Sequence, residues 1–171
     1  ITGLILGLYY VPSPEGDPPE AYRSLAFIMT SVPFGYTLRA LHHWAAHLMI
    51  ASVFLHMLRV YFTGAYREAR EVNWMLGVVL LNLTLFFGYT GYLLPWNQLA
   101  FWAGVIGINI FSALPLIGQQ VASFIFGGLE MSGAALARMY IFHVYLLPMA
   151  VTGLIILHLI IVWVQGGAEP H

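Results

Sequence analysis

Histidines recur inside two apolar segments of this 171-residue chain, where ionisable side chains are rare. The segment 41–56 reads LHHWAAHLMIASVFLH. An α-helix turns 100° and rises 1.5 Å per residue, so His42 and His56, 14 residues apart, differ by about 40° in direction and about 21 Å in height. His143 and His158, 15 residues apart, differ by about 60° and about 22 Å. Each segment therefore presents two imidazoles on one face, near opposite ends.

The two histidine-bearing helices are expected to run parallel, because one further span separates them in the sequence. His42 then faces His143, and His56 faces His158. Two opposed imidazoles are the axial ligands that haem b requires, since the porphyrin fills four of the six positions of the iron. The spacing therefore predicts two haems b stacked across one bilayer, with these four histidines as the iron ligands.

Two further histidines face elsewhere. His47 is nine residues from His56, which places it on the opposite face, and His43 lies about 140° from His56. We interpret both as structural histidines that bond to neighbouring helices. Buried histidines could also relay protons in a haem-free transporter or scaffold. A reduced-minus-oxidised spectrum separates that alternative from haem binding.

Two glycines in the intervening span repeat the histidine spacing. Gly77 and Gly91 are 14 residues apart, and a missing side chain lets a flat macrocycle lie close to the backbone. We expect Gly77 to contact the inner haem and Gly91 the outer one, with Gly3 as a further contact of the outer haem. Small residues also mediate ordinary helix packing in membranes, which is the competing interpretation.

Arginines stand close to three of the histidines, at the ends of the spans. Arg39 precedes His42 by three residues, Arg59 follows His56 by three, and Arg138 precedes His143 by five. Guanidinium groups there could pair with haem propionates in a bidentate manner. Arginines that snorkel to the membrane interface are the alternative.

The composition identifies an integral membrane protein. Of the residues 60% are hydrophobic and 8% are charged, and the mean hydropathy is +0.82. Residues 40–58, 72–129 and 139–168 contain no Asp, Glu, Lys or Arg, so at least three segments reach the ~20 residues of a spanning helix. The chain has no cysteine, which excludes disulfides, thiolate metal sites and thioether-linked haem within it. A net charge of −1 gives no basic surface for nucleic acid.

These properties predict one all-α membrane domain over residues 1–171. The proline-rich segment 12–38 is expected to form a surface connection with a short helix, and 96–137 to form short interfacial helices. Pro148 should kink the last span. The first apolar segment is too short to cross a bilayer and resembles the end of a helix. The expected helices span about 1–11, 39–62, 74–94 and 139–165.

Positive charge helps to orient the spans. The turn after the first complete span contains Arg67 and Arg70, with Arg59 close by. Cytoplasmic loops are enriched in basic residues, so this turn is expected on the cytoplasmic or stromal side.

Several stretches together resemble the N-terminal, haem-carrying part of cytochrome b in its shorter cytochrome b6 form. The resemblance covers nearly the whole chain. The 15-residue histidine spacing is similar to cytochrome b6 and bacterial menaquinol relatives, whereas mitochondrial-type chains have 14. The matching stretches are FGYTLRALHHW, FLHMLRVYFTGAYREAREVNWMLGVVL, GYTGYLLPWNQLAFWA, FSALPLIG and ARMYIFHVYLLPM.

This resemblance implies a four-helix transmembrane bundle, its first helix truncated, that holds two haems b. His42 and His143 would bind the haem near the positive side of the membrane, and His56 and His158 the haem near the negative side. The chain would be a subunit of a quinol:cytochrome c or plastocyanin oxidoreductase. Such a complex oxidises quinol, sends one electron to a Rieske iron–sulfur protein and passes the other through both haems to a quinone. Proton translocation accompanies this transfer.

The resemblance also implies partners. GYLLPWNQLAFWA and FSALPLIG are similar to one wall of the quinol-oxidation pocket, and the other wall would come from a C-terminal cytochrome b part or a subunit IV-like chain. The Rieske protein, a c-type cytochrome, membrane lipid and a second copy of the complex are the other expected partners. No residue is assigned a catalytic role.

Two departures from the family pattern bear on these expectations. Cytochrome b6 of photosynthetic membranes has an upstream cysteine for a third haem, and this chain has none, although the corresponding segment could precede Ile1. A bacterial cell membrane is expected rather than a thylakoid membrane. Trp163 stands five residues after His158, where the family usually has Arg or His near the reduced quinone. An indole cannot supply a proton as an imidazole does, so water should bring the protons there.

A di-haem membrane anchor of a formate dehydrogenase or hydrogenase is the remaining alternative. It would also carry four histidines on helices. Such an anchor has no need of the glycine pair Gly77 and Gly91 or of the long segment 96–137.

Overall fold

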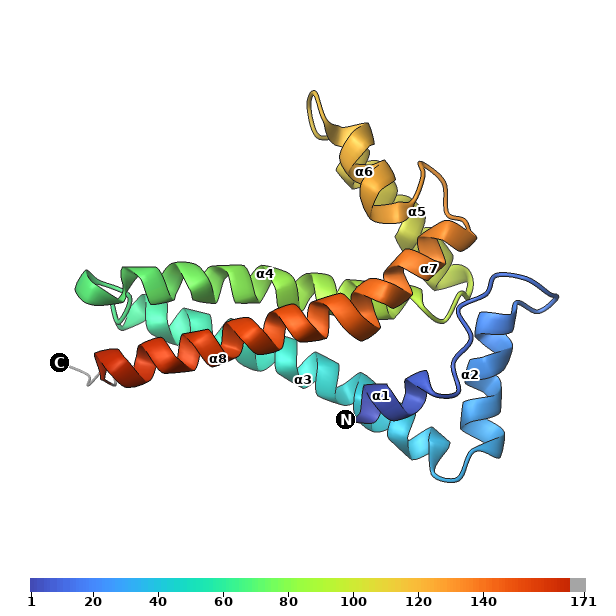
Figure 1. The fold of residues 1–171 in the computed structure, drawn as a ribbon, viewed down its shortest axis with the longest axis horizontal. Coiled ribbons are helices and arrows are strands. Elements are labelled where there is room, and N and C mark those ends of the chain that lie inside the picture. The colour runs from blue at the N-terminus through green and yellow to red at the C-terminus, as the bar shows by residue number, and fades with distance from the viewer. Residues whose placement is uncertain (167–171) are drawn as a thin grey trace.

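The computed structural model describes residues 1–166, which form helices and loops with no strand among them (Figure 1). The expected all-α membrane fold is confirmed. The last five residues of the expected domain lie outside the described part of the chain. The elements are α1 (Thr2–Gly7), α2 (Glu20–Ser31), α3 (Gly35–Phe62), the 3₁₀ turn η1 (Glu68–Arg70), α4 (Glu71–Leu93), α5 (Gln98–Ser112), α6 (Gly118–Phe126), α7 (Gly133–Ile141), the π-helical turn η2 (Phe142–Leu146) and α8 (Leu147–Gln165).

Three helical segments within residues 1–166 are long and apolar enough to cross a bilayer. Each begins before its expected start: α3 at Gly35, α4 at Glu71, and the last span at Gly133. The residues added to the last span include three alanines and a leucine, which favour helix and therefore extend it beyond the charged Arg138. The first helix, α1, ends at Gly7. The three spans are Gly35–Phe62, Glu68–Leu93 and Gly133–Gln165.

Helix α4 separates the two helices that carry the histidines. It packs on α3 and also on α7, η2 and α8, whereas α3 and α8 make few contacts with each other. Figure 1 shows α3, α4 and α8 running alongside one another, with α1 against the start of α3. The side chains of Leu80 and Thr84 are buried on α4. The bundle thus leaves the histidine-bearing faces of α3 and α8 apart.

The last span changes its winding at the π-helical turn Phe142–Leu146, directly before Pro148. Proline has no N–H to donate, so the backbone carbonyl four residues earlier loses its usual partner, and a wider turn accommodates this. The π turn also adds one residue between His143 and His158. Their spacing of 15 residues is therefore equivalent to about 14 residues of regular helix, the spacing of the two histidines on α3.

The segment after α4 forms a hairpin of α5 and α6 that extends away from the bundle (Figure 1). Its base packs against α4 and α7, and the Oη of Tyr89 donates to the carbonyl of Ala103 at 3.1 Å. The short helices expected over 96–137 are present. The core at this junction consists of Leu93, Ile108, Ala122, Phe126, Ala135 and Met139.

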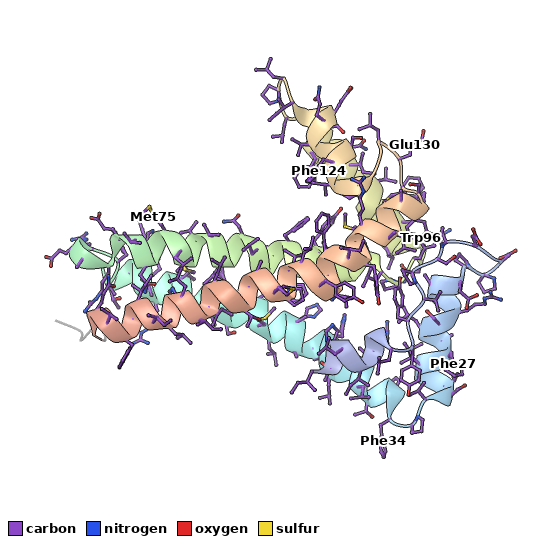
Figure 2. The ribbon with its side chains drawn as sticks, in the orientation of Figure 1. Phe27, Phe34, Met75, Trp96, Phe124 and Glu130 are labelled. Carbon is purple, nitrogen blue, oxygen red and sulfur yellow. The ribbon has the colours of Figure 1, made fainter. Side chains whose placement is uncertain are left out.

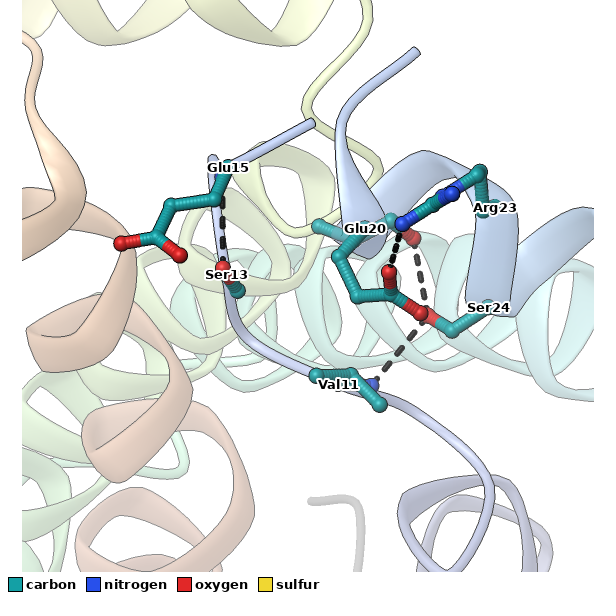
Figure 3. A network of polar contacts seen from close by, with 7 residues as sticks. Val11, Ser13, Glu15, Glu20, Arg23 and Ser24 are labelled. Atoms are coloured by element: carbon teal, nitrogen blue, oxygen red, sulfur yellow. Dashed lines mark hydrogen bonds and ion pairs between the residues drawn. The ribbon is translucent and has the colours of Figure 1, made fainter. Parts of the chain in front are cut away.

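Polar contacts fasten the connection between α1 and α2 (Figure 3). The backbone N–H of Val11 donates to Oγ of Ser24, which itself donates to the carbonyl of Ala21 at 2.9 Å. Arg23 pairs with Glu20 on the exposed side of α2. Nearby, the Tyr10 hydroxyl donates to the carbonyl of Leu94 at 2.6 Å. The Tyr10 bond therefore ties the connection after α1 to the end of α4, and the Val11 bond ties it to α2.

Many large apolar side chains of the spans, loops and hairpin point outward. Phe34, Met75 and Phe124 are 83%, 59% and 75% exposed, and Figure 2 shows them on the outside of the molecule. In water such a surface would be strongly unfavourable, whereas in hydrocarbon it costs nothing and the helices satisfy their own backbone bonds. The exposed surface is therefore that of an integral membrane protein.

We expect Gly35→Ala to destabilise the fold. A Cβ at Gly35 would overlap the backbone carbonyl of Ile28, which cannot move without shifting α2, so a cost of about 1–3 kcal/mol follows. Thermal unfolding of the detergent-solubilised protein, followed by circular dichroism, measures it. Gly153→Ala on α8 is the matched control, because a Cβ there meets nothing within 4 Å. Equal midpoints for the two variants would contradict this prediction.

Candidate functional site

The structure brings together the two histidine pairs that the helical spacing predicts. His42 on α3 and His143 in the π turn have ring centres 6.0 Å apart, with ring planes at 90°. His56 on α3 and His158 on α8 have ring centres 6.4 Å apart, with planes at 82°. Both pairs bridge the space between α3 and the last span, one toward each end of the bundle.

These distances fit one metal ion between each pair. A metal–imidazole bond is about 2.0 Å and the ring nitrogen lies about 1.1 Å from the ring centre, so two imidazoles on opposite sides of an ion have centres about 6.2 Å apart. The observed 6.0 and 6.4 Å bracket that value. No cluster of three or more His, Cys, Asp or Glu side chains suited to a metal occurs within residues 1–166. Two protein ligands per ion fit a metal whose remaining positions are filled by a macrocycle.

Each selected glycine lies beside one of these histidines. A Cβ at Gly91 would lie 2.9 Å from Nδ1 of His143, and nearer still to its Cε1. A Cβ at Gly3 would lie 3.0 Å from Cε1 of His42. A Cβ at Gly91 would therefore force the ring of His143 to shift, and a Cβ at Gly3 would make an unusually tight contact with His42.

Gly77 is less crowded. A Cβ there would lie 3.9 Å from Cε1 of His158 and 3.5 Å from Sδ of Met57, which are ordinary van der Waals distances. Gly77 and Gly91 repeat the spacing of the histidines, but only Gly77 has room for a Cβ. The sequence does not reveal this difference.

Hydrogen bonds orient the rings of the outer pair. Nδ1 of His143 lies 3.0 Å from the carbonyl of Phe87 and 3.3 Å from Oγ1 of Thr90, and Nδ1 of His42 lies 3.1 Å from Oγ1 of Thr2. A carbonyl only accepts, so Nδ1 of His143 carries the proton and Nε2 keeps its lone pair, the form that binds a metal.

The inner pair differs in this respect. Nδ1 of His158 is buried and has no hydrogen-bond partner within the described residues. Sequence reasoning missed Thr2, Phe87 and Thr90 as partners of the outer pair. One signal was present, because Thr2 precedes Gly3 and Thr90 precedes Gly91, so the same Thr-Gly dipeptide meets each outer histidine.

His43 and His47 lie away from both pairs. Their ring centres are 4.5 Å apart, and His47 donates from Nδ1 to the carbonyl of His43 at 2.8 Å. Trp44 completes this exposed group, with its ring 5.9 Å from that of His47.

The arginines have diverse surroundings. Nη1 of Arg138 donates to the carbonyls of Ser123 and Phe124 in the last turn of α6. This guanidinium therefore caps the C-terminal end of the short helix. Arg39 approaches Sδ of Met29 on α2 at 3.4 Å. Arg59 lies in the last turn of α3.

Trp163 lies near the end of α8 with 84% of its surface exposed. It is directed away from the helices that the structure describes. Trp163 lies five residues, or about one and a half helical turns, beyond His158 toward the end of the span, as expected from the sequence.

Comparison with known proteins matches this geometry to one family. The family model described as cytochrome b/b6/petB matches residues 1–166. The chain is 46% identical to cytochrome b6 of Heliobacterium mobile, over 99% of this chain and 78% of that protein. It is 42% identical to the menaquinol:cytochrome c reductase cytochrome b subunit of Bacillus subtilis, over 99% and 75%.

A solved structure has the same fold. A chain of a hyperthermophilic respiratory Complex III superposes with a TM-score of 0.85 at 29% identity, over 99% of this chain and 45% of that one. The family resemblance seen in the sequence is thereby confirmed, which removes the support for an unrelated anchor or transporter. The chain belongs to the cytochrome b family.

Proposed function

We propose that this chain carries electrons across the membrane through two haems b, as a subunit of a quinol:cytochrome c or plastocyanin oxidoreductase. The observation that carries the proposal is the pair of opposed imidazoles at each end of the bundle, 6.0 and 6.4 Å between ring centres. Bound haem would supply reversible one-electron chemistry. His42 and His143 would hold one haem, His56 and His158 the other.

The protein's own contribution is to hold the ligands in place. Thr2 and the carbonyl of Phe87 fix the rings of the outer pair, and helix α4 spaces α3 from α8. Gly91 and Gly3 leave the outer rings room. The hydrocarbon around the spans would limit the access of water to the iron ligands, which affects the redox potential.

The relatives' names support the setting of this activity. The Bacillus subtilis relative is a menaquinol:cytochrome c reductase subunit, and the chain spans 45% of the Complex III chain that it resembles. We infer a C-terminal cytochrome b part or subunit IV-like chain, a Rieske protein, a c-type cytochrome and a dimeric assembly as partners. We also infer a bacterial cell membrane as the location.

Oxidation of one quinol releases two electrons and two protons on the positive side. One electron passes to the Rieske protein and the other to this chain, so two quinol oxidations would deliver the two electrons that reduce one quinone on the negative side. The exposed Trp163 lies at that end of α8. Its indole donates a hydrogen bond but no proton at physiological pH, so water would supply the protons there.

Removing single ligands tests the pairing directly. We expect His42→Ala or His143→Ala to abolish one b haem, and His56→Ala or His158→Ala to abolish the other, because one imidazole rarely holds haem in a membrane bundle. Reduced-minus-oxidised spectra and pyridine haemochrome analysis of the purified protein measure the haem content. His43→Ala is the matched control, one residue from a proposed ligand. A loss of haem in that control equal to the loss in His42→Ala would contradict the pairing.

The glycines give a second test, with a graded outcome. Gly91→Ala should displace the ring of His143 and alter the spectrum of the outer haem, since the added Cβ would lie 2.9 Å from Nδ1. Gly77→Ala should leave both spectra nearly unchanged, because its Cβ would meet Met57 and His158 at 3.5 and 3.9 Å. A larger residue such as Val at Gly77 should disturb the inner haem. Identical spectra for all three variants would show that these glycines only pack helices.

Thr2 is expected to tune the outer haem. A hydrogen bond accepted from Nδ1 raises the basicity of the ligand and stabilises ferric iron. Thr2→Val should therefore raise the midpoint potential of that haem, by at most about tenfold in the equilibrium constant, or about 59 mV. Thr2→Ser keeps the acceptor and should keep the potential. Redox titration measures both haems, and an equal shift of the inner haem would exclude this role.

A further inference from the structure

A buried methionine stands beside the inner histidine pair. Met57 is 9% exposed, and the buried residues of α3 are Gly35 and Met57. Met57 directly follows His56, so its side chain leaves the helix about 100° around from that imidazole. It is no iron ligand in the proposed pathway, and the burial of its side chain calls for another role.

Met57 approaches α4 and α8 at one place. A Cβ at Gly77 would lie 3.5 Å from Sδ of Met57 and 3.9 Å from Cε1 of His158. The thioether and the imidazole therefore share the space in front of Gly77. Three helices, α3, α4 and α8, meet there beside the inner pair.

The outer pair is held in a different way. Gly91 brings α4 directly against the ring of His143, and the carbonyl of Phe87 lies 3.0 Å from Nδ1 of that ring. The close contact limits where the ring can lie, and the hydrogen bond limits how it can rotate.

The ring of His158 has no such bond. Its Nδ1 is buried and lacks a hydrogen-bond partner within the described residues. The rings of His56 and His158 nevertheless stand at 82° to each other. Rotation of an imidazole about its last side-chain bond is intrinsically broad, so it is limited by the atoms packed around the ring. Packing must therefore set the angle of the inner pair.

We propose that Met57 is the positioning residue of the inner pair, and that its thioether holds the ring of His158 as a hydrogen bond holds the outer ring. The proposal rests on the proposed function, in which His158 binds the inner haem. Methionine suits this role because its unbranched chain fills irregular gaps and its sulfur makes favourable contacts at the edge of an aromatic ring.

Electron paramagnetic resonance of the purified, oxidised complex tests the proposal, because the g-values of low-spin ferric haem depend on the angle between the two axial imidazole planes. Met57→Ala should shift the low-field g-value of the inner haem and leave that of the outer haem unchanged. Met57→Leu, of similar volume, should keep both values. Met49→Ala is the matched control, because Met49 lies on the same helix and is 36% exposed. The signal that His158→Ala removes is that of the inner haem.

A double substitution tests whether Met57 acts through the space at Gly77. Gly77→Ala alone should keep both signals, since its Cβ would meet its neighbours at ordinary distances. Combined with Met57→Ala, the added methyl would occupy part of the space that the thioether leaves. The shift should then be smaller than in Met57→Ala alone, a non-additivity expected of residues in contact.

Three results would overturn the proposal: an unchanged inner g-value in Met57→Ala, an equal shift in Met49→Ala or Met57→Leu, and equal shifts with and without Gly77→Ala. Selective loss of the inner haem from Met57→Ala, with retention in Met57→Leu, would support it. Met57→Val provides the same comparison if Met57→Ala does not assemble. Absence of both haems from the wild type would instead refute the proposed function.

Discussion

An imidazole inside hydrocarbon is most stable when both of its ring nitrogens have a partner, and the outer end of this bundle meets that condition at Nδ1. For the outer pair, Nδ1 is satisfied by Thr2 and by the carbonyl of Phe87. The ring centres of His42 and His143 lie 6.0 Å apart across the space between α3 and the last span. Unpaired polar groups in a membrane cost several kcal/mol each, so these rings hold their helices to a narrow range of separations.

Helix α4 determines that separation. It contacts both histidine-bearing helices, while they contact each other little. Glycine at position 91 lets α4 touch the ring of His143, and the looser contact at Gly77 leaves the inner end more room. The two ends of one bundle therefore differ in rigidity, with a hydrogen-bonded, crowded pair at one end and a freer pair, including the unpartnered Nδ1 of His158, at the other.

The sequence predicted much of this arrangement because helical periodicity is nearly rigid. Angular position along an α-helix depends only on residue count, so the spacing alone is enough to match His42 and His56 with His143 and His158. The first residues of the three spans were less predictable, because the residues just before each expected start are themselves apolar or favour helix. The partners of Arg138 and of the Nδ1 atoms come from segments distant in the sequence, and periodicity contains no information about them.

The apolar exterior and the hairpin of α5 and α6 show a second limit of sequence reasoning. Composition indicated short helices over 96–137, yet their departure from the bundle depends on the packed junction around Leu93 and Phe126. Close contacts such as Tyr89 against Gly107 fix the angle of the hairpin. Such contacts depend on three-dimensional complementarity, which a linear pattern does not encode.

Because of the π-helical turn at Phe142–Leu146, the number of residues between His143 and His158 does not by itself fix their separation along the helix axis. A segment of 15 residues with one widened turn covers the same vertical distance as 14 residues of regular helix. One extra residue between the two histidines can therefore be accommodated in this helix without breaking the match to α3. The spacing of 15 residues here and of 14 on α3 meet one geometric requirement.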